Sequence, residues 1–205
     1  MTGWTTHKGT AVALDIENVD TDQLIPARFM STPRAEGYGR FLLHDMRNDS
    51  EGRPDPSFPI NRYPGASVLV GRRNFGSGSS REAAVYALVD FGIRAVIAPS
   101  FGDIFASNSV NNGLLPALVS EGDADRLIAL SGQSQTELSL DIENRKIEVG
   151  DLKIPFTISA AWAQKLINGW DDIDLTEHHR PAISAFRARR AQTLPWVFPA
   201  EETTG

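Results

Sequence analysis

Residues 71–82 (GRRNFGSGSSRE) combine the residue types of this sequence that are best suited to binding an anion. Gly76 and Gly78 let backbone N–H groups approach a ligand closely, because glycine has no side chain in the way. A helix is predicted to begin directly after the segment, and the positive end of its dipole would face the same place. Arg81 adds a planar guanidinium that can hold a carboxylate through two hydrogen bonds. Together these features predict a cradle for an anion.

Three well-known glycine loops are excluded by single residues of this segment. A phosphate-binding P-loop needs a lysine after its second spaced glycine, but Gly76 is followed by Ser77. A dinucleotide-binding loop needs a third glycine where Arg81 stands. The nucleophile elbow of hydrolases needs a closing glycine, and Ser80 is followed by Arg81 and Glu82 instead. The segment therefore indicates neither a nucleotide-binding loop nor an α/β-hydrolase.

A purely structural explanation of the same residues stays open at this point. Ser79 and Glu82 have the spacing of a capping box, in which the two side chains satisfy the first N–H groups of a helix. Gly76 and Gly78 would then only form the turn before that helix. The segment alone does not decide between an anion site and a helix start.

Alternating strands and helices are expected to position this segment. The predicted elements are strands at residues 10–16, 66–70 and 93–98, a hairpin over residues 138–149, and helices at residues 83–91, between Ser100 and Asn112, and at residues 159–168. Gly92 and Gly169 are placed to end two of these helices, and Ser100 with Asp103 to cap another. The order strand, glycine-rich turn, helix, strand, helix predicts an α/β fold.

Two further stretches have less regular patterns. Residues 26–64 are rich in Pro, Gly, Arg and Asp and have no clear periodicity, which is typical of a functional or mobile loop. Arg187, Arg189 and Arg190 form a basic cluster near the C-terminus. A solvated helix face is the default explanation of that cluster, and contact with a partner chain is the alternative.

Composition limits the possible classes of protein. The chain has 205 residues, of which 41% are hydrophobic and 22% charged, as in a soluble globular protein. Its formal net charge of -6 argues against a nucleic-acid-binding face. It contains no cysteine, so it offers no thiolate nucleophile and no thiolate ligand for an iron–sulfur cluster. No secretory signal or membrane-spanning run is visible, and a cytoplasmic location is expected.

Several segments of the sequence resemble segments of one protein family and follow one another in the same order as in that family. Residues 74–82 (NFGSGSSRE) closely resemble the serine loop of the aconitase superfamily. Four more segments are similar to isopropylmalate isomerase small subunits: residues 18–26 (NVDTDQLIP), 96–105 (VIAPSFGDIF), 108–116 (NSVNNGLLP) and 169–176 (GWDDIDLT). They are spread from residue 18 to residue 176, so the resemblance extends over nearly the whole chain, and their combination is specific although each one alone is weak.

The resemblance implies a fold. It is the swivelling β/β/α domain, an α/β fold that forms the mobile last domain of aconitase and is a separate chain in the isomerase. We therefore expect one such domain over residues 1–205, with a C-terminal helical extension and a loose tail from about residue 195.

The resemblance also implies a reaction and a partner. The family interconverts 2-isopropylmalate and 3-isopropylmalate in leucine biosynthesis, by removing water and adding it back one carbon over. This lyase activity uses a 4Fe–4S cluster as a Lewis acid. Because this chain has no cysteine, the cluster is expected on a large partner subunit in a heterodimer, and this chain itself is expected to bind no cofactor and no metal.

Site residues carry over from the family position by position. Ser79 matches the base, which would act as an alkoxide stabilised by loop N–H groups and Arg81. Ser80 and Arg81 match residues that hold a substrate carboxylate. Asp22 matches a carboxylate that orients a catalytic histidine of the partner, and Arg34 lies in the loop where the family has a substrate-binding arginine.

Two departures from the family pattern keep alternatives open. Many relatives have Cys at the position of Ser77 and His at the position of Ala83. The chain could therefore serve a related alkylmalate or citramalate hydro-lyase, or be a non-catalytic anion-binding module that kept the serine loop. An autonomous hydrolase using Ser79 is a poor alternative, because none of the four histidines lies in a triad motif.

Overall fold

A mixed β-sheet forms the centre of the computed structural model, which describes residues 2–133 and 135–198. Seven strands of the described residues pair in the order β4-β3-β2-β1-β5-β6-β7. The strands are β1 (Thr6–Leu14), β2 (Ala66–Gly71), β3 (Ala95–Ala98), β4 (Leu115–Leu118), β5 (Thr136–Asp141), β6 (Lys146–Val149) and β7 (Leu152–Pro155). Strands β1 to β4 are parallel, whereas β5 to β7 form an antiparallel meander that joins the sheet along β1.

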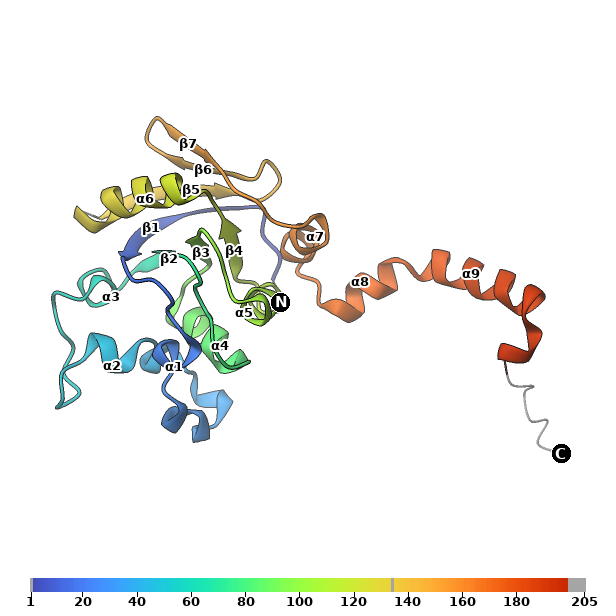
Figure 1. Ribbon diagram of the computed structural model, residues 1–205, viewed down its shortest axis with the longest axis horizontal. Coiled ribbons are helices and arrows are strands. Elements are labelled where there is room, and N and C mark those ends of the chain that lie inside the picture. Colours follow the sequence, from blue (N-terminus) through green and yellow to red (C-terminus); the bar gives the residue numbers. More distant parts are fainter. Residues whose placement is uncertain (1, 134, 199–205) are drawn as a thin grey trace.

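Helices cover both faces of this sheet (Figure 1). The longer helices of the body are α4 (Glu82–Phe91), α5 (Asp103–Asn111), α6 (Glu121–Gln133) and α7 (Ala160–Asn168). Successive side chains of a strand point to opposite faces, so Val12 of β1 packs in the core with α4, while Ala11 and Ala13 pack in the core with α6. The parallel half of the sheet is thus buried on both sides, which explains its apolar runs.

The irregular stretch between β1 and β2 consists of short helices. They are α1 (Thr21–Leu24), η1 (Ala27–Ser31), η2 (Arg34–Glu36), η3 (Gly39–Phe41), α2 (His44–Arg47) and α3 (Pro59–Arg62). Leu42, Leu43 and Ile60 are buried in the same core as α4. These anchors explain how a segment without sequence periodicity still has a defined course.

Most elements predicted from the sequence are confirmed, with some corrections. The helix before Gly92, the helix before Gly169 and the hairpin around residue 144 are present. The first strand was placed too late, because β1 begins at Thr6, where it pairs with β5. Ser100 does not cap α5: its hydroxyl accepts the N–H of Asn74 at 2.7 Å, and Gly102 stands at the cap without a side-chain hydrogen bond.

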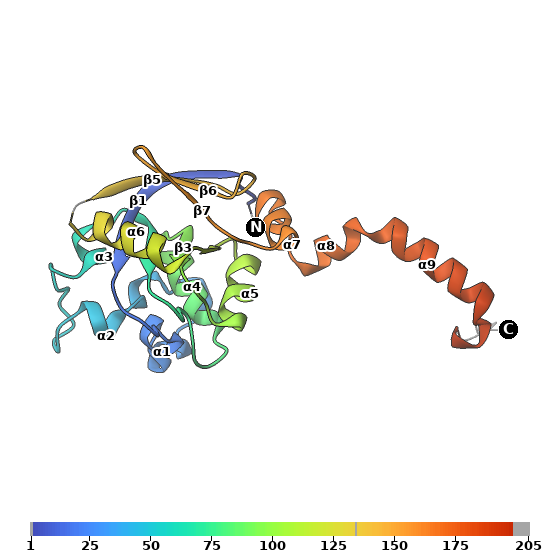
Figure 2. The same ribbon diagram turned by 45° about the horizontal axis from the view of Figure 1, so that its top comes forward.

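Beyond α7 the chain leaves the body. The region in which the sequence predicts a helical extension contains α8 (Asp172–His178), α9 (Arg180–Thr193) and the short η4 (Pro195–Val197). Figures 1 and 2 both show these helices standing clear of the sheet and its covering helices. We call residues 172–198 the arm. Most of the loose tail predicted from about residue 195, namely residues 199–205, lies outside the described residues.

Candidate functional site

The serine loop, residues 72–81, lies between two neighbouring loops at the carboxyl edge of the parallel strands. It follows β2, and the loops after β1 and β3 flank it because these strands lie on either side of β2. The Gly76 N–H donates to the Val19 carbonyl at 2.7 Å, and the Thr21 N–H donates to the Ser77 carbonyl at 3.0 Å. On the other side, the Gly102 N–H donates to the Phe75 carbonyl at 2.9 Å. The fold therefore fixes the loop from both sides.

Two glycines permit this close approach. Gly76 has a φ of +72°, and a Cβ at this position would overlap the ring of Phe105. A Cβ on Gly102 would lie 2.5 Å from the Gly76 carbonyl oxygen. Phe75 is fully buried below the loop, with its ring centroid 5.5 Å from that of Phe105. The loop backbone thus lies directly on an aromatic support, and side chains at these glycines would displace it.

A cavity of about 240 Å³ opens above this support. Its lining includes residues 76–79 and Arg81 from the serine loop, Thr21, and the first residues of α5 (Asp103, Ile104 and Phe105). Within the described part of the chain, the backbone N–H groups of Gly78, Ser79 and Ser80 donate to no protein acceptor. These groups are available to an anion, as the glycine pattern predicts.

Ser79 is exposed at this cavity and its hydroxyl is unengaged. Its carbonyl accepts a hydrogen bond from the Thr21 hydroxyl at 2.9 Å, which fixes its backbone. Among the described residues, its hydroxyl has no hydrogen-bond partner. The capping box with Glu82 is not formed, because Arg81 is the N-cap of α4 and no side chain caps that helix. The structural explanation of Ser79 is therefore wrong, and its side chain is free for another role.

Arg81 and Asp22 are brought together, although 59 positions separate them in the sequence. The guanidinium of Arg81 forms an ion pair with the carboxylate of Asp22, which projects from α1. A capping box between Asp20 and Gln23 holds that short helix in place. The Asp22 side chain is about half exposed, so a second chain could reach it. Arg81 thus binds a carboxylate of the chain itself, and its role towards a substrate carboxylate stays a prediction.

Arg34 and Ser80 are not part of this cavity lining. Arg34 donates to both carboxylate oxygens of Asp90, at 2.6 and 2.9 Å, and its guanidinium lies 4.3 Å from the ring centroid of Tyr86. Asp90 belongs to the last turn of α4, whereas the serine loop precedes its first turn. Burial raises the pKa of Tyr86, as does a hydrogen bond from its hydroxyl to the Glu82 carboxylate. Ser80 is exposed next to Ser79 without lining the cavity.

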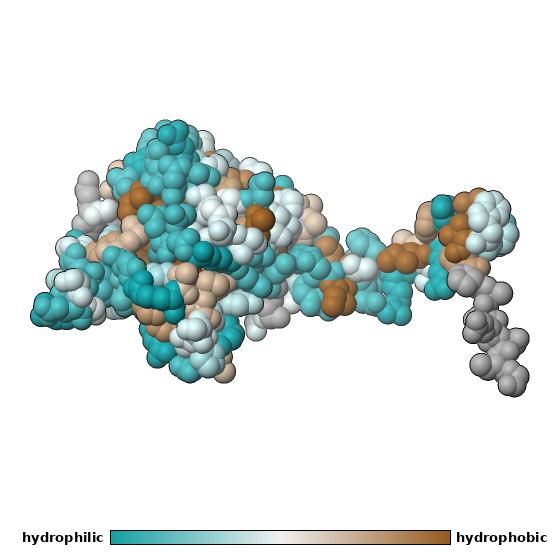
Figure 3. All heavy atoms as spheres, turned by 60° about the horizontal axis from the view of Figure 1, so that its bottom comes forward, coloured by the Kyte–Doolittle hydropathy of each residue, from teal (hydrophilic) through white to brown (hydrophobic). Residues whose placement is uncertain are grey.

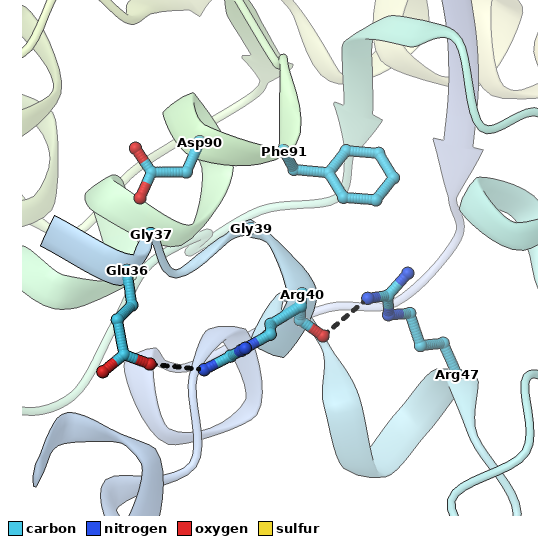
Figure 4. A pocket seen from close by; sticks show the side chains of 7 residues that line it. All are labelled: Glu36, Gly37, Gly39, Arg40, Arg47, Asp90 and Phe91. Carbon is cyan, nitrogen blue, oxygen red and sulfur yellow. Dashed lines mark hydrogen bonds and ion pairs between the residues drawn. The ribbon is translucent and has the colours of Figure 1, made fainter. Parts of the chain in front are cut away.

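A second cavity, of about 350 Å³, lies at that other end of α4 (Figure 4). Asp90 and Phe91 form one side of it, and Glu36, Arg40 and Arg47 form the other. Figure 4 shows Glu36 in an ion pair with Arg40, and Arg47 donating to the Arg40 carbonyl at 2.8 Å. Glu36 and Arg40 pair with each other and Asp90 pairs with Arg34, so this cavity offers a ligand less than the serine-loop cavity does.

The sequence analysis missed Thr21 and the start of α5 as parts of the site. Thr21 is buried and joins the serine loop through both its N–H and its hydroxyl. Asp103 and Ile104 line the cavity because β3 neighbours β2. The strands at residues 66–70 and 93–98 were predicted, and parallel strands end at one edge, so this neighbourhood was an available signal.

The described part of the chain shows neither a metal-ligand cluster nor a membrane-spanning helix. No cluster of three or more His, Asp or Glu side chains among residues 2–133 and 135–198 could hold a metal ion. No helix in those residues is long and apolar enough to cross a membrane.

Comparison with known proteins gives consistent matches. Residues 1–122 match the aconitase C-terminal domain. The chain is 44% identical over 194 residues to the 3-isopropylmalate dehydratase small subunit of Shewanella denitrificans, covering 92% of this chain and 96% of that one. It is 42% identical over 187 residues to the protein of the same name from Shouchella clausii, covering 90% and 95%. The crystal structure of a 3-isopropylmalate dehydratase from Methanocaldococcus jannaschii matches with a TM-score of 0.64 and 26% identity, over 88% of this chain and 98% of that one.

Proposed function

Because this chain belongs to the family of 3-isopropylmalate dehydratase small subunits, with the aconitase C-terminal fold, we propose that it is the small subunit of an isopropylmalate isomerase. The enzyme is a hydro-lyase of leucine biosynthesis. It removes water from 2-isopropylmalate and adds it back to give 3-isopropylmalate. The observation that carries the proposal is the unengaged Ser79 hydroxyl, which shares a cavity with Arg81 and free N–H groups.

Ser79 would act as the base of the elimination. As an alkoxide it would take the proton from the carbon beside a substrate carboxylate, while the hydroxyl on the neighbouring carbon leaves. The N–H groups of Gly78 and Ser80, the N-terminus of α4 and Arg81 would stabilise the negative charge on its oxygen. Water then adds to the double bond in the opposite sense, and Ser79 returns the proton.

Substrate binding would involve the charged residues around the cavity. Arg81 would exchange the Asp22 carboxylate for a substrate carboxylate, with Ser80 contributing its hydroxyl. Asp22, released from Arg81, would orient a histidine of the large subunit. Arg34 would contribute only after its ion pair with Asp90 opens.

A second subunit is needed in this proposal for two reasons. The chain has no cysteine and its described residues contain no metal-ligand cluster, so a 4Fe–4S cluster does not fit on it. We place that cluster on the large subunit, where it would supply a Lewis acid for the leaving hydroxyl. The exposed Ser79 also has to be closed off from bulk water. The assembly would be a heterodimer, which we expect in the cytoplasm.

Reconstitution tests the proposal. The chain is mixed anaerobically with the cluster-loaded large subunit of the same source, and the absorbance of the unsaturated intermediate is followed. We expect turnover only in the mixture, and a loss of about 10³-fold with Ser79→Ala, because general-base catalysis contributes about 10² to 10⁴-fold. Ser50→Ala, at an exposed serine of another loop, is the matched control and should retain full activity.

Substrates other than isopropylmalate form a second arm of the same assay. Ala83 fills a buried position in the core at the start of α4, where many relatives have histidine. Turnover of citramalate or another alkylmalate in place of isopropylmalate would retain the mechanism and change the substrate. A stable complex without turnover of any of these would overturn the catalytic proposal in favour of an anion-binding module.

A further inference from the structure

Beyond its first helix, α8, the arm does not pack against the body of the molecule. Every residue of α9 is exposed, and Figures 1 and 2 show α8 and α9 projecting away from the sheet. Helices of about 12 to 15 residues are marginal in water without tertiary packing, and α9 has 14 residues. The arm therefore has the properties of a segment whose packing partner is another chain.

The side chains of the arm indicate what kind of surface would cover it. Ile183 and Phe186, three positions apart on α9, are 48% and 52% exposed, and Trp196 in η4 is 76% exposed. Figure 3 shows hydrophobic surface, coloured brown, at several places along the arm. Such aromatic anchors are typical of the centres of protein interfaces and unusual on solvated surfaces.

The charge of α9 also indicates which kind of partner surface would cover the arm. The α9 helix carries four arginines and no acidic residue: Arg180, Arg187, Arg189 and Arg190. Arginine is enriched at protein interfaces, where its guanidinium pairs with carboxylates. The complementary surface would thus have an apolar recess bordered by Asp or Glu side chains.

The root of the arm is fixed, and it is fixed close to the serine loop. Lys165 is only 3% exposed, and its ammonium binds Asp172, the first residue of α8, at 2.6 Å, and also Asn111 at the end of α5. The next residue, Asn112, donates to Glu82 at 3.0 Å, directly after the serine loop. The other end of α5 lines the cavity, about 14 Å away for nine residues. A partner that closes the cavity would therefore stand beside the arm.

We propose that the arm is a second docking element for the large subunit, separate from the serine-loop cavity. This inference rests on the proposed function, because the same partner covers both sites. Phe186 and Trp196 would enter an apolar recess of the large subunit, and Arg187, Arg189 and Arg190 would pair with acidic residues around it, since Arg180 is already paired with Glu177. The arm supplies affinity and does not touch the reacting atoms.

A titration separates this role from catalysis. The full-length chain and its double variant Phe186→Ala/Trp196→Ala are titrated into a fixed amount of cluster-loaded large subunit. We expect the concentration for half-maximal activity to rise at least tenfold, with the maximal rate unchanged. Leu130→Ala, which removes a 42% exposed leucine from α6, is the matched control and should leave both values unchanged.

The outcomes distinguish the two proposals. In one outcome the wild-type chain turns over substrate, while the double variant reaches half-maximal activity at the same concentration as the wild type. That result would overturn the arm inference and leave the proposed function intact. If a direct binding assay shows that binding of the large subunit depends on the arm, but no malate derivative is turned over, the arm inference would stand and the proposed function would be overturned. Sedimentation of the chain alone tests whether a second copy of this chain, and not the large subunit, covers the arm. Self-association that the double variant abolishes, with unchanged affinity for the large subunit, would also overturn the inference.

Discussion

The serine loop and the arm obtain their order from opposite sources. The loop has no regular secondary structure of its own, but backbone hydrogen bonds to the loops after β1 and β3 fix it, and Phe75 and Phe105 support it from below. The arm is almost entirely helical, yet only its root, at Asp172, is bonded to the body, and the side chains of α9 face solvent. Local stability follows the number of buried contacts and not the regularity of the backbone.

This difference separates two tasks of the molecule. Catalysis requires donors that are already in place when charge develops, and the serine loop has its N–H groups positioned by the body of the chain. Association requires only a complementary surface, which can become ordered when the partner arrives. We therefore expect substitutions at the loop to alter folding and rate, and substitutions on α9 and η4 of the arm to alter affinity alone.

The strongest expected effect concerns Gly76. Gly76→Ala would place a Cβ in the ring of Phe105 at a φ of +72°, and strain and overpacking together should cost about 4 kcal/mol of unfolding free energy. Gly52→Ala is the matched control, because Gly52 has a φ of +77° with nothing within 4 Å of its Cβ, and only about 1 kcal/mol should be lost there. Urea unfolding midpoints measure both. Equal losses would show that the serine loop is not tightly supported.

A pair of phenylalanines compares the two regions directly. Phe105→Ala removes a buried ring from under the serine loop and should cost about 3 to 5 kcal/mol. Phe186→Ala removes a ring from α9 that is half exposed and should change stability by less than about 0.5 kcal/mol. Thermal and denaturant unfolding of the lone chain give both values. A large loss from Phe186→Ala would mean that the arm packs on the body in solution.

The root of the arm should show an intermediate effect. Asp172→Asn leaves the buried ammonium of Lys165 without its charged partner, and we expect a loss of about 2 kcal/mol, as for a hydrogen bond to a charged group. Asp151→Asn, at an exposed aspartate of the turn between β6 and β7, should cost almost nothing. If both variants unfold at the same urea concentration, Asp172 does not anchor the arm.

Local sequence patterns were sufficient for elements whose signals are local. The apolar runs of β2 and β3 and the C-terminal glycines of α4 and α7 were found in this way. The start of β1 was misplaced because it depends on pairing with β5, more than 120 residues later. Strand β4 contains Pro116, which argues against a strand except at a sheet edge, and its edge position is known only from the fold.

The same limit applies to the candidate site: its local patterns could be predicted from the sequence, and its contacts between distant residues could not. The serine loop and Arg81 have a local pattern, and the resemblance added Asp22 for a role towards the partner; its ion pair with Arg81 was not predicted. The ion pair of Arg34 with Asp90 links residues 56 positions apart and could not be anticipated, because no local pattern relates η2 to the end of α4. The contribution of Thr21 likewise depends on β1 and β2 being neighbours.

Removal of the part of the arm beyond α8 should have the smallest effect on the fold. A chain that ends at His179 lacks α9, whose residues are all exposed, so its unfolding free energy should change by less than about 0.5 kcal/mol.

Amide hydrogen exchange gives a second measurement on the full chain. Amides of α9 should exchange rapidly in the lone chain and slowly in the complex, whereas those of α4 should be slow in both, because α4 is packed in the core on the lone chain already. Slow exchange of α9 without the partner would remove the contrast between the two regions, since the arm would then be ordered by the chain itself.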